Sequence, residues 1–315
     1  MDNLKVIEKE IENINYILKT KYDELFKMDR DIFKSEILEN VGHIRKLKKL
    51  NSEELKSLGL LVGIDGSTNR VGGAYPHYIE LFQALAKPTI GEDLFLNEIY
   101  SPMTEVISSE EENFNKDKML AQIELDAAIK SAKLHKPKMI MMDGGLIRYQ
   151  INDKNKYDEL KNICEEENIV FFGVIKDIKT NIISRNSDYD DSIFDRELLF
   201  GSLEIGEIIE IKNEKNNKYL DGDLVSAFLR TSSSANAIGL DILESQRNNL
   251  EDVANLVYTL TPESSRGVPL WLDIVDKEVK ITDKLIKSML EEYLDRDIYE
   301  RFFISERDRR TLWKL

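Results

Sequence analysis

Residues 60–67 read LLVGIDGS, and residues 139–145 read MIMMDGG. Each is a short apolar run that ends in an aspartate followed by glycine, which is typical of a buried strand that stops at a turn. A third apolar run, IVFFGVIK at residues 169–176, follows a helical stretch near residues 157–167. Strands that alternate with helices predict an α/β sheet.

Outward from these runs, the pattern predicts the remaining elements. After Asp65 the polar GST predicts a tight loop, and a second strand is expected around YIELFQALA at residues 78–86. A helix is expected over residues 112–135, and it should end there because Pro137 follows. The other expectations are an exposed loop at 179–195, strands at 206–212, 218–230 and 236–244, and helices from about Asn248 and Val268.

The region before the first strand is charged and has a helical period. Its apolar residues recur every three or four positions, as in Leu4, Ile7, Ile11 and Ile14. Such a stripe packs on the main core of the same chain or on a partner subunit. We therefore expect an N-terminal helical extension over residues 1–55, with dimer or partner contacts, followed by one α/β domain over residues 56–315.

Composition narrows the class of protein. The chain has 315 residues, 42% of them hydrophobic, which is enough for a sizeable core. Its formal net charge of −15 disfavours nucleic acid as a partner unless basic groups or metal ions gather locally. Cys164 is the only cysteine, so no disulfide forms within the chain, and the cytoplasm is the expected compartment. No apolar run approaches about 18 residues, so we expect no membrane span.

Acidic residues supply the candidate chemistry. Asp65 and Asp143 each end an apolar run, and Glu124 falls on the apolar side of its predicted helix. A carboxylate in an apolar stripe needs a cation, so Glu124 either pairs with a Lys or Arg elsewhere or binds a metal ion. On a later predicted helix, Asp276 lies beside apolar positions, with Asp273 three residues before it. Four such carboxylates suit Mn²⁺ or Mg²⁺.

Basic residues could bring phosphate to these acids. Lys176 ends the third apolar run, where its ammonium group could meet a phosphate oxygen, although a solvated lysine fits equally well. The further candidates for a nucleic-acid-binding surface are Arg70, Lys179, Arg185 and Arg196, together with Arg307, Arg309 and Arg310.

Taken together, the segments from about residue 60 to 285 resemble the NurA family of nucleases. The resemblance is carried by IDGS at 64–67, Glu124 placed 19 residues before Asp143, DGGL at 143–146, GVIKD at 173–177 and VPLWLDIVD at 268–276. It implies an RNase H-like mixed sheet flanked by helices, and Asp65, Glu124 and Asp143 as metal-binding acids. In the family, a tyrosine and a histidine often occupy the positions of Val268 and Asp276, so those two roles do not carry over.

The same resemblance implies a function. It is that of a manganese- or magnesium-dependent DNA nuclease, acting as a 5′ to 3′ exonuclease and single-strand endonuclease on DNA ends. The family works as a homodimer docked on a hexameric HerA-type ATPase. Taking the resemblance together with the acids and the lysine identified above, we expect Asp65, Glu124 and Asp143 to hold the ions, Asp276 to serve as a fourth acid from the later helix, and Lys176 to stabilise charge on the phosphate.

Two other classes remain open. A strand followed by IDGST also begins the actin-like and sugar-kinase ATPases, in which Ser67 and Thr68 would contact ATP. Alternatively, the chain is a non-catalytic assembly subunit that uses its N-terminal helices for contacts. The metal dependence of DNA cleavage discriminates the three.

Overall fold

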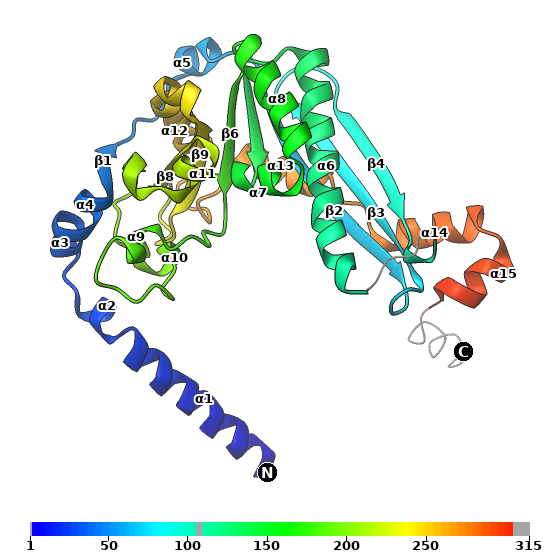
Figure 1. The fold of residues 1–315 in the computed structure, drawn as a ribbon, viewed down its shortest axis with the longest axis horizontal. Helices are drawn as coiled ribbons and strands as arrows, with labels where there is room; N and C mark the ends of the chain where they lie inside the picture. Colours follow the sequence, from blue (N-terminus) through cyan, green and yellow to red (C-terminus); the bar gives the residue numbers. More distant parts are fainter. Residues whose placement is uncertain (1, 105–108, 305–315) are drawn as a thin grey trace.

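A single mixed sheet organises the part of the chain that the computed structural model describes, residues 2–104 and 109–304. Its nine strands lie in the order β1-β7-β8-β9-β6-β5-β2-β3-β4. They are β1 (Gly42–Lys46), β2 (Leu61–Gly72), β3 (Tyr78–Pro88), β4 (Leu94–Tyr100), β5 (Met139–Asp143), β6 (Val170–Ile175), β7 (Glu207–Ile211), β8 (Leu224–Arg230) and β9 (Ile238–Leu243). Strands β2, β5 and β6 pair in parallel, and the other pairs are antiparallel. The expected mixed sheet flanked by helices is confirmed (Figure 1).

Helices cover both faces of this sheet. The α-helices are α1 (Asp2–Lys21), α2 (Asp23–Lys27), α3 (Arg30–Phe33), α4 (Glu39–Val41), α5 (Ser52–Ser57), α6 (Ser109–His135), α7 (Leu146–Asn152), α8 (Lys154–Glu166), α9 (Ile182–Arg185), α10 (Asp195–Leu198), α11 (Asn217–Gly222), α12 (Leu250–Thr259), α13 (Leu270–Glu278), α14 (Asp283–Tyr293) and α15 (Arg296–Ile298). Short 3₁₀ or π segments are η1 (Lys34–Leu38), η2 (Pro102–Thr104), η3 (Asn213–Lys215), η4 (Glu244–Asn249) and η5 (Tyr299–Phe303). No helix within the described residues is long and apolar enough to cross a membrane.

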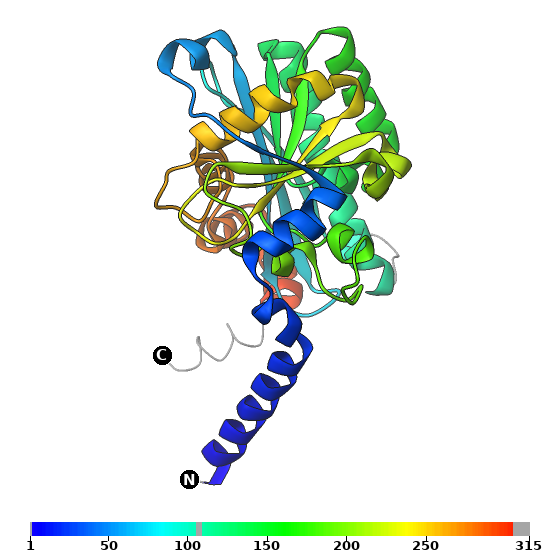
Figure 2. The ribbon, with the colours of Figure 1, turned by 90° about the vertical axis from the view of Figure 1, so that its left-hand side faces the viewer.

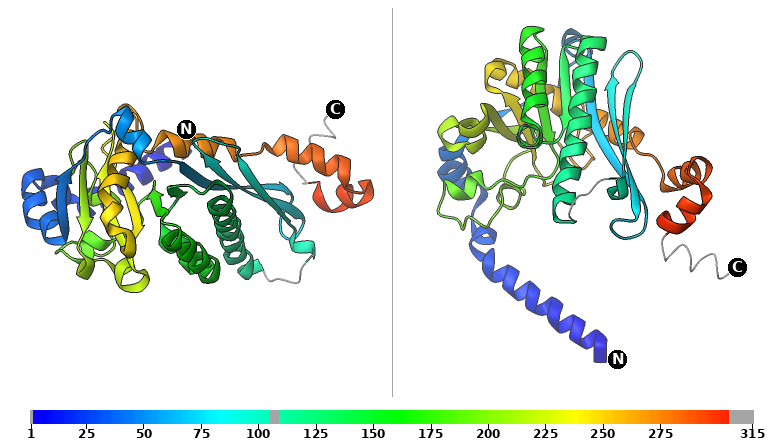
Figure 3. Two further views of the ribbon diagram at one scale, coloured as in Figure 1. Left: turned by 90° about the horizontal axis from the view of Figure 1, so that it is seen from above. Right: turned by 45° about the vertical axis from the view of Figure 1, so that its right-hand side comes forward.

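The alternation of side chains along the central strands divides the core in two. Val62 and Ile64 of β2 pack into the cluster formed with α6, α7 and α8, whereas Leu61 packs into the cluster formed with α12 and α13. Figure 3 shows α6 to α8 on one side of the sheet and α13 on the other. Both sides of the central strands are therefore buried, which explains why their sequences read as continuous apolar runs.

Strand β2 departs from the expected strand, tight loop and second strand. It continues through the glycine and serine after Asp65 as far as Gly72, because β3 pairs with it from Val62↔Pro88 to Gly72↔Tyr78. The prediction of a loop at GST was wrong, and the turn lies beyond Gly72. Asp65 consequently sits within a long antiparallel hairpin rather than at a strand end.

The N-terminal region also differs from expectation. Helix α1 projects away from the body of the molecule (Figures 1 and 2), and its apolar residues Leu4, Ile7, Ile11 and Ile14 are 48–66% exposed. Of the two alternatives that the sequence leaves open, packing of this stripe on the main core is therefore wrong. Residues 42–46, within the region expected to be helical, instead form strand β1 and pair with β7 at the sheet edge.

Two further segments were assigned incorrectly from sequence. Residues 217–222 form helix α11 rather than a strand, because the side chain of Asn216 accepts the Lys218 backbone N–H and Asp223 ends the helix in a left-handed conformation. The predicted exposed loop after residue 179 contains α9 and buries Ile182 and Ile183 in a third apolar cluster beneath β7 and β8. The predicted helix at 112–135 is confirmed as α6.

Candidate metal centre

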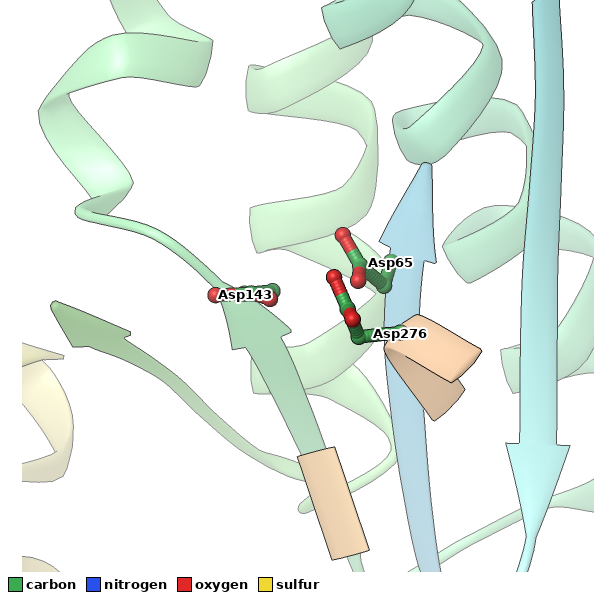
Figure 4. Close-up of side chains that lie close together, drawn as sticks. All are labelled: Asp65, Asp143 and Asp276. Atoms are coloured by element: carbon green, nitrogen blue, oxygen red, sulfur yellow. The ribbon is translucent and has the colours of Figure 1, made fainter. Parts of the chain in front are cut away.

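Three aspartates from separate stretches of the chain meet at the end of β5. Asp65 of β2, Asp143 of β5 and Asp276 of α13 each place one carboxylate oxygen within 4.8 Å of the others (Figure 4). The last parallel pair between β2 and β5 is Ile64↔Met142, so Asp65 and Asp143 follow side by side. The sheet register therefore assembles the first two acids, and a helix supplies the third.

A glycine brings that helix close. A Cβ atom at Gly63 would stand 2.9 Å from Val275 Cγ2 and 3.0 Å from Trp271 Cδ1. Because residue 63 has no side chain, α13 lies directly on β2, and Asp276, next to Val275, reaches the face that carries Asp65. Sequence reasoning missed this role of Gly63, since its reason lies in a helix more than two hundred residues away.

Asp65 is the most buried of the three acids, with 7% of its surface exposed. Its Oδ1 accepts the Gly66 backbone N–H at 2.8 Å, while its Oδ2 has no hydrogen-bond partner among the described residues. Burial, followed by the charges of Asp143 and Glu124, raises the pKa of Asp65 to about 9, against the opposing charge of Lys176. An unpartnered buried oxygen beside two other carboxylates fits a divalent cation, which would remove this repulsion.

Lys176 lies at the same site, as expected from its place after β6. Its Nζ forms an ion pair with Asp143 Oδ2, and the two side chains are 19% and 12% exposed. The lysine thus partly neutralises the acid cluster.

Asp276 faces the cluster, whereas Asp273 turns toward solvent-facing Arg266 and forms an ion pair with it. Asp276 also accepts a hydrogen bond from Lys280 Nζ at 2.7 Å. Partial burial acts to raise the pKa of Asp276, but the Lys280 hydrogen bond and the charge of Lys176 together lower it below its ordinary value. This carboxylate is accordingly ionised and available at neutral pH.

Glu124 lies on the inward face of α6, as predicted, with 1% of its surface exposed. Its carboxylate forms an ion pair with Arg148 of α7, one of the two alternatives that the sequence leaves open. Burial raises the pKa of Glu124, and the charge of Arg148 opposes that rise. Glu124 stands on the α6 face of β2, against Gly66, whereas the three aspartates occupy the α13 face.

The loop after Asp143 is anchored by a residue that sequence reasoning missed. Asp241 of β9 is fully buried and accepts the Leu146 backbone N–H at 3.2 Å, the Ser226 hydroxyl at 2.8 Å and Lys218 Nζ at 2.9 Å. Arg148 was missed as well. Its only signal was a cation shortly after the DGGL motif, on the helix that this loop begins.

Most of the predicted nucleic-acid-binding residues do not gather at the acids, although Arg196 and Lys176 line the same hollow. Arg70 lies farther along β2, beside Glu80 at 3.5 Å and over the Tyr78 ring. Lys179 and Arg185 are exposed beyond β6, and Arg196 pairs with Asp177 at 3.1 Å. Arg307, Arg309 and Arg310 lie outside the described residues.

Comparisons with known proteins agree with this architecture. The family model of the NurA domain matches residues 59–281. The structure is similar to that of the NurA nuclease from Sulfolobus solfataricus, with 15% identity, coverage of 94% of this chain and 98% of that chain, and a TM-score of 0.53. It is also similar to NurA bound to dAMP and manganese, with 13% identity, coverage of 92% and 99%, and a TM-score of 0.59. A comparison with curated proteins finds no match. Because the family model spans most of the sequence, the chain belongs to the NurA family.

Proposed function

We propose that this protein is a divalent-metal-dependent deoxyribonuclease. The observation that carries the proposal is the convergence of Asp65, Asp143 and Asp276, with oxygens within 4.8 Å of one another and one buried oxygen of Asp65 left without a hydrogen-bond partner. Family membership supports it, as does the manganese in the crystals of a NurA relative.

In this proposal each residue of the site has a role that follows from its position. Asp65, Asp143 and Asp276 would hold Mn²⁺ or Mg²⁺, and Glu124 is the fourth candidate ligand because its carboxylate lies against Gly66, next to Asp65. A cation held there supplies Lewis acidity, which activates water and stabilises the oxygen that leaves phosphorus. Lys176 sits beside Asp143 and stabilises negative charge on the phosphate oxygens.

The finer assignment follows the NurA resemblance. We propose 5′ to 3′ exonuclease and single-strand endonuclease activity on DNA ends, in the cytoplasm, together with a hexameric HerA-type ATPase. The exposed basic residues Arg70, Lys179, Arg185 and Arg196 would contact phosphates along the DNA.

The N-terminal extension, residues 1–55, would provide contacts with a second copy or with the ATPase. Its support is the exposed apolar stripe of α1, which includes Ile11 and Ile14 at 61% and 54% exposure. Light scattering of the full chain should give a dimer mass, and Ile11→Glu with Ile14→Glu should give a monomer that still cleaves DNA. A wild-type monomer that also fails to bind the ATPase would overturn this assignment.

The test of the nuclease uses labelled single- and double-stranded DNA with Mn²⁺, Mg²⁺ or EDTA. Cleavage should require the metal and should be lost in Asp65→Asn, whereas Asp126→Asn on the outer side of α6 should cleave as the wild type does. The HerA-type ATPase is included in parallel reactions. Equal cleavage by wild type and Asp65→Asn would refute the site, and ATP hydrolysis with intact DNA would favour the kinase-like alternative.

A further inference from the structure

A small hollow adjoins the acid cluster on the side away from β3. Its volume is about 170 Å³, and its polar lining comes from Lys176, Asp177, Arg196, Asn236 and Arg266. Three of these five side chains are cations, on a chain whose formal net charge is −15. Three cations gathered around one hollow of an acidic protein point to a site for an anion, provided that their present carboxylate partners can be exchanged.

The hollow and the acid cluster share a wall. Lys176 lines the hollow and also pairs with Asp143. Arg266 pairs with Asp273, which precedes Asp276 by three residues on α13, and the charges of Asp276 and Asp143 both act on its guanidinium. An anion in the hollow would therefore lie next to the group bound at Asp65, Asp143 and Asp276.

The two arginines of the hollow have carboxylate partners that another anion can replace at little cost. The Arg196–Asp177 pair has side chains 56% and 69% exposed, and those of the Arg266–Asp273 pair are 59% and 33% exposed. Exposed pairs of this kind contribute about 0–1 kcal/mol, so replacing the carboxylate by another anion costs little. The guanidinium fork matches phosphate oxygens in a bidentate arrangement, which favours phosphate as that anion.

We propose that this hollow binds a phosphate group of the DNA strand next to the phosphodiester that is cut. The inference rests on the proposed nuclease function and adds Arg266 and Asn236 to its substrate-binding residues. The hollow is smaller than the roughly 300–1,000 Å³ of pockets for drug-sized ligands, so it suits a phosphate rather than a base and sugar together. That phosphate is either internal to the strand or the terminal 5′-phosphate, which carries more charge than a diester.

The test measures DNA binding and cleavage separately in the full chain. Binding of single-stranded oligonucleotides with a 5′-phosphate or a 5′-hydroxyl is followed by fluorescence anisotropy in Ca²⁺ over a range of salt concentrations. We expect Arg266→Gln and Arg196→Gln each to raise Kd about tenfold and to reduce the salt slope by about 1. In Mn²⁺, KM should rise more than kcat falls. Arg266→Lys should recover part of the binding.

A matched control is Arg296→Gln on α15, an exposed arginine that also pairs with a carboxylate, that of Glu300. Its Kd and salt slope should equal those of the wild type. If the hollow takes a terminal phosphate, wild type prefers the 5′-phosphorylated strand and the variants lose that preference. If the hollow takes an internal phosphate, the variants should bind the 5′-phosphorylated and the 5′-hydroxyl strands more weakly by the same factor.

Unchanged Kd and salt slope in both Arg266→Gln and Arg196→Gln would overturn the inference. Cleavage that is still lost in Asp65→Asn would show that the nuclease proposal survives this result. Conversely, if the wild type binds DNA through these arginines but never cleaves it, the nuclease proposal is refuted and the phosphate-binding site still stands.

Discussion

Gly66 lies so close to Glu124 that a Cβ atom at position 66 would stand 2.6 Å from Glu124 Oε1. The same atom would meet Leu120 Cδ1 at 2.7 Å, so α6 presses directly on the backbone of β2. The Asp-Gly pair is a common turn signal, but here it lies within a continuous strand, and its glycine allows α6 to pack closely against that strand. As a result, the Asp65 carboxylate lies on one side of β2 and the Glu124 carboxylate lies on the other, against the neighbouring residue Gly66.

The first prediction concerns this contact. Gly66→Ala should displace Glu124 and α6, destabilise the protein by about 1–3 kcal/mol and reduce metal-dependent cleavage at least tenfold. Thermal unfolding and a DNA cleavage assay measure the two effects. Gly73→Ala is the matched control, because the nearest atom to its Cβ is His77 O at an ordinary 3.6 Å. Equal behaviour of the two variants would contradict the proposed role of Gly66.

A second prediction follows from the burial of Asp65. In metal-free buffer at pH 8, Asp65→Asn should raise the free energy of unfolding by at least about 1 kcal/mol, because it removes a carboxyl group whose ionisation is disfavoured there. The same variant should lose cleavage. Calorimetry in EDTA measures the stability, and Asp126→Asn serves as the surface control. A less stable Asp65→Asn would mean that this carboxylate already has a favourable partner.

The pH dependence of the metal-free protein has a definite sign. The folded state raises the pKa of Asp65 from an ordinary value of 3.8 to about 9, so the folded protein holds a proton that the unfolded chain releases. This contribution to stability is complete below pH 3.8 and is lost as the pH rises through about 9. We expect the free energy of unfolding of Asp65→Asn not to show this decline between pH 5 and 9. Manganese affinity, measured by calorimetry, should rise over the same interval because metal and proton compete.

The two aspartates of α13 should behave differently. Asp276→Asn should weaken manganese binding at least tenfold, because Asp276 shares the acid cluster, whereas Asp273→Asn should leave it nearly unchanged. Titration of each variant with Mn²⁺ distinguishes them. Similar losses in both variants would place the metal outside the cluster formed with Asp65 and Asp143.

Patterns within single elements predicted much of this fold. The apolar runs before Asp65 and Asp143 are strands because both faces of the central sheet are covered, and Glu124 points inward because the helical period of α6 requires it. The convergence of Asp65 with Asp143 follows from parallel pairing, which alternating strands and helices already suggest.

Features that depend on a remote partner were missed. The true end of β2 depends on its pairing with β3, and the partner of Glu124 comes from α7. An apolar stripe has the same sequence whether it packs on its own core or remains exposed, so the sequence could not decide where α1 lies. Local capping contacts determine that residues 217–222 form helix α11. The hydrogen bond that the Asn216 side chain accepts starts a helix there, although the residues that follow have a strand-like pattern.

The ion pair between Glu124 and Arg148 gives a test of whether Glu124 binds metal. Arg148→Met leaves a fully buried carboxylate without its cation, which should destabilise the metal-free protein by about 3 kcal/mol. Arg148→Lys keeps the charge and should lose less. If Glu124 is a metal ligand, Mn²⁺ replaces the missing cation, and the increase in Tm on adding Mn²⁺ should be larger for Arg148→Met than for the wild type. An equal increase in both proteins would mean that Glu124 has a structural role only, and that the three aspartates hold the metal without it.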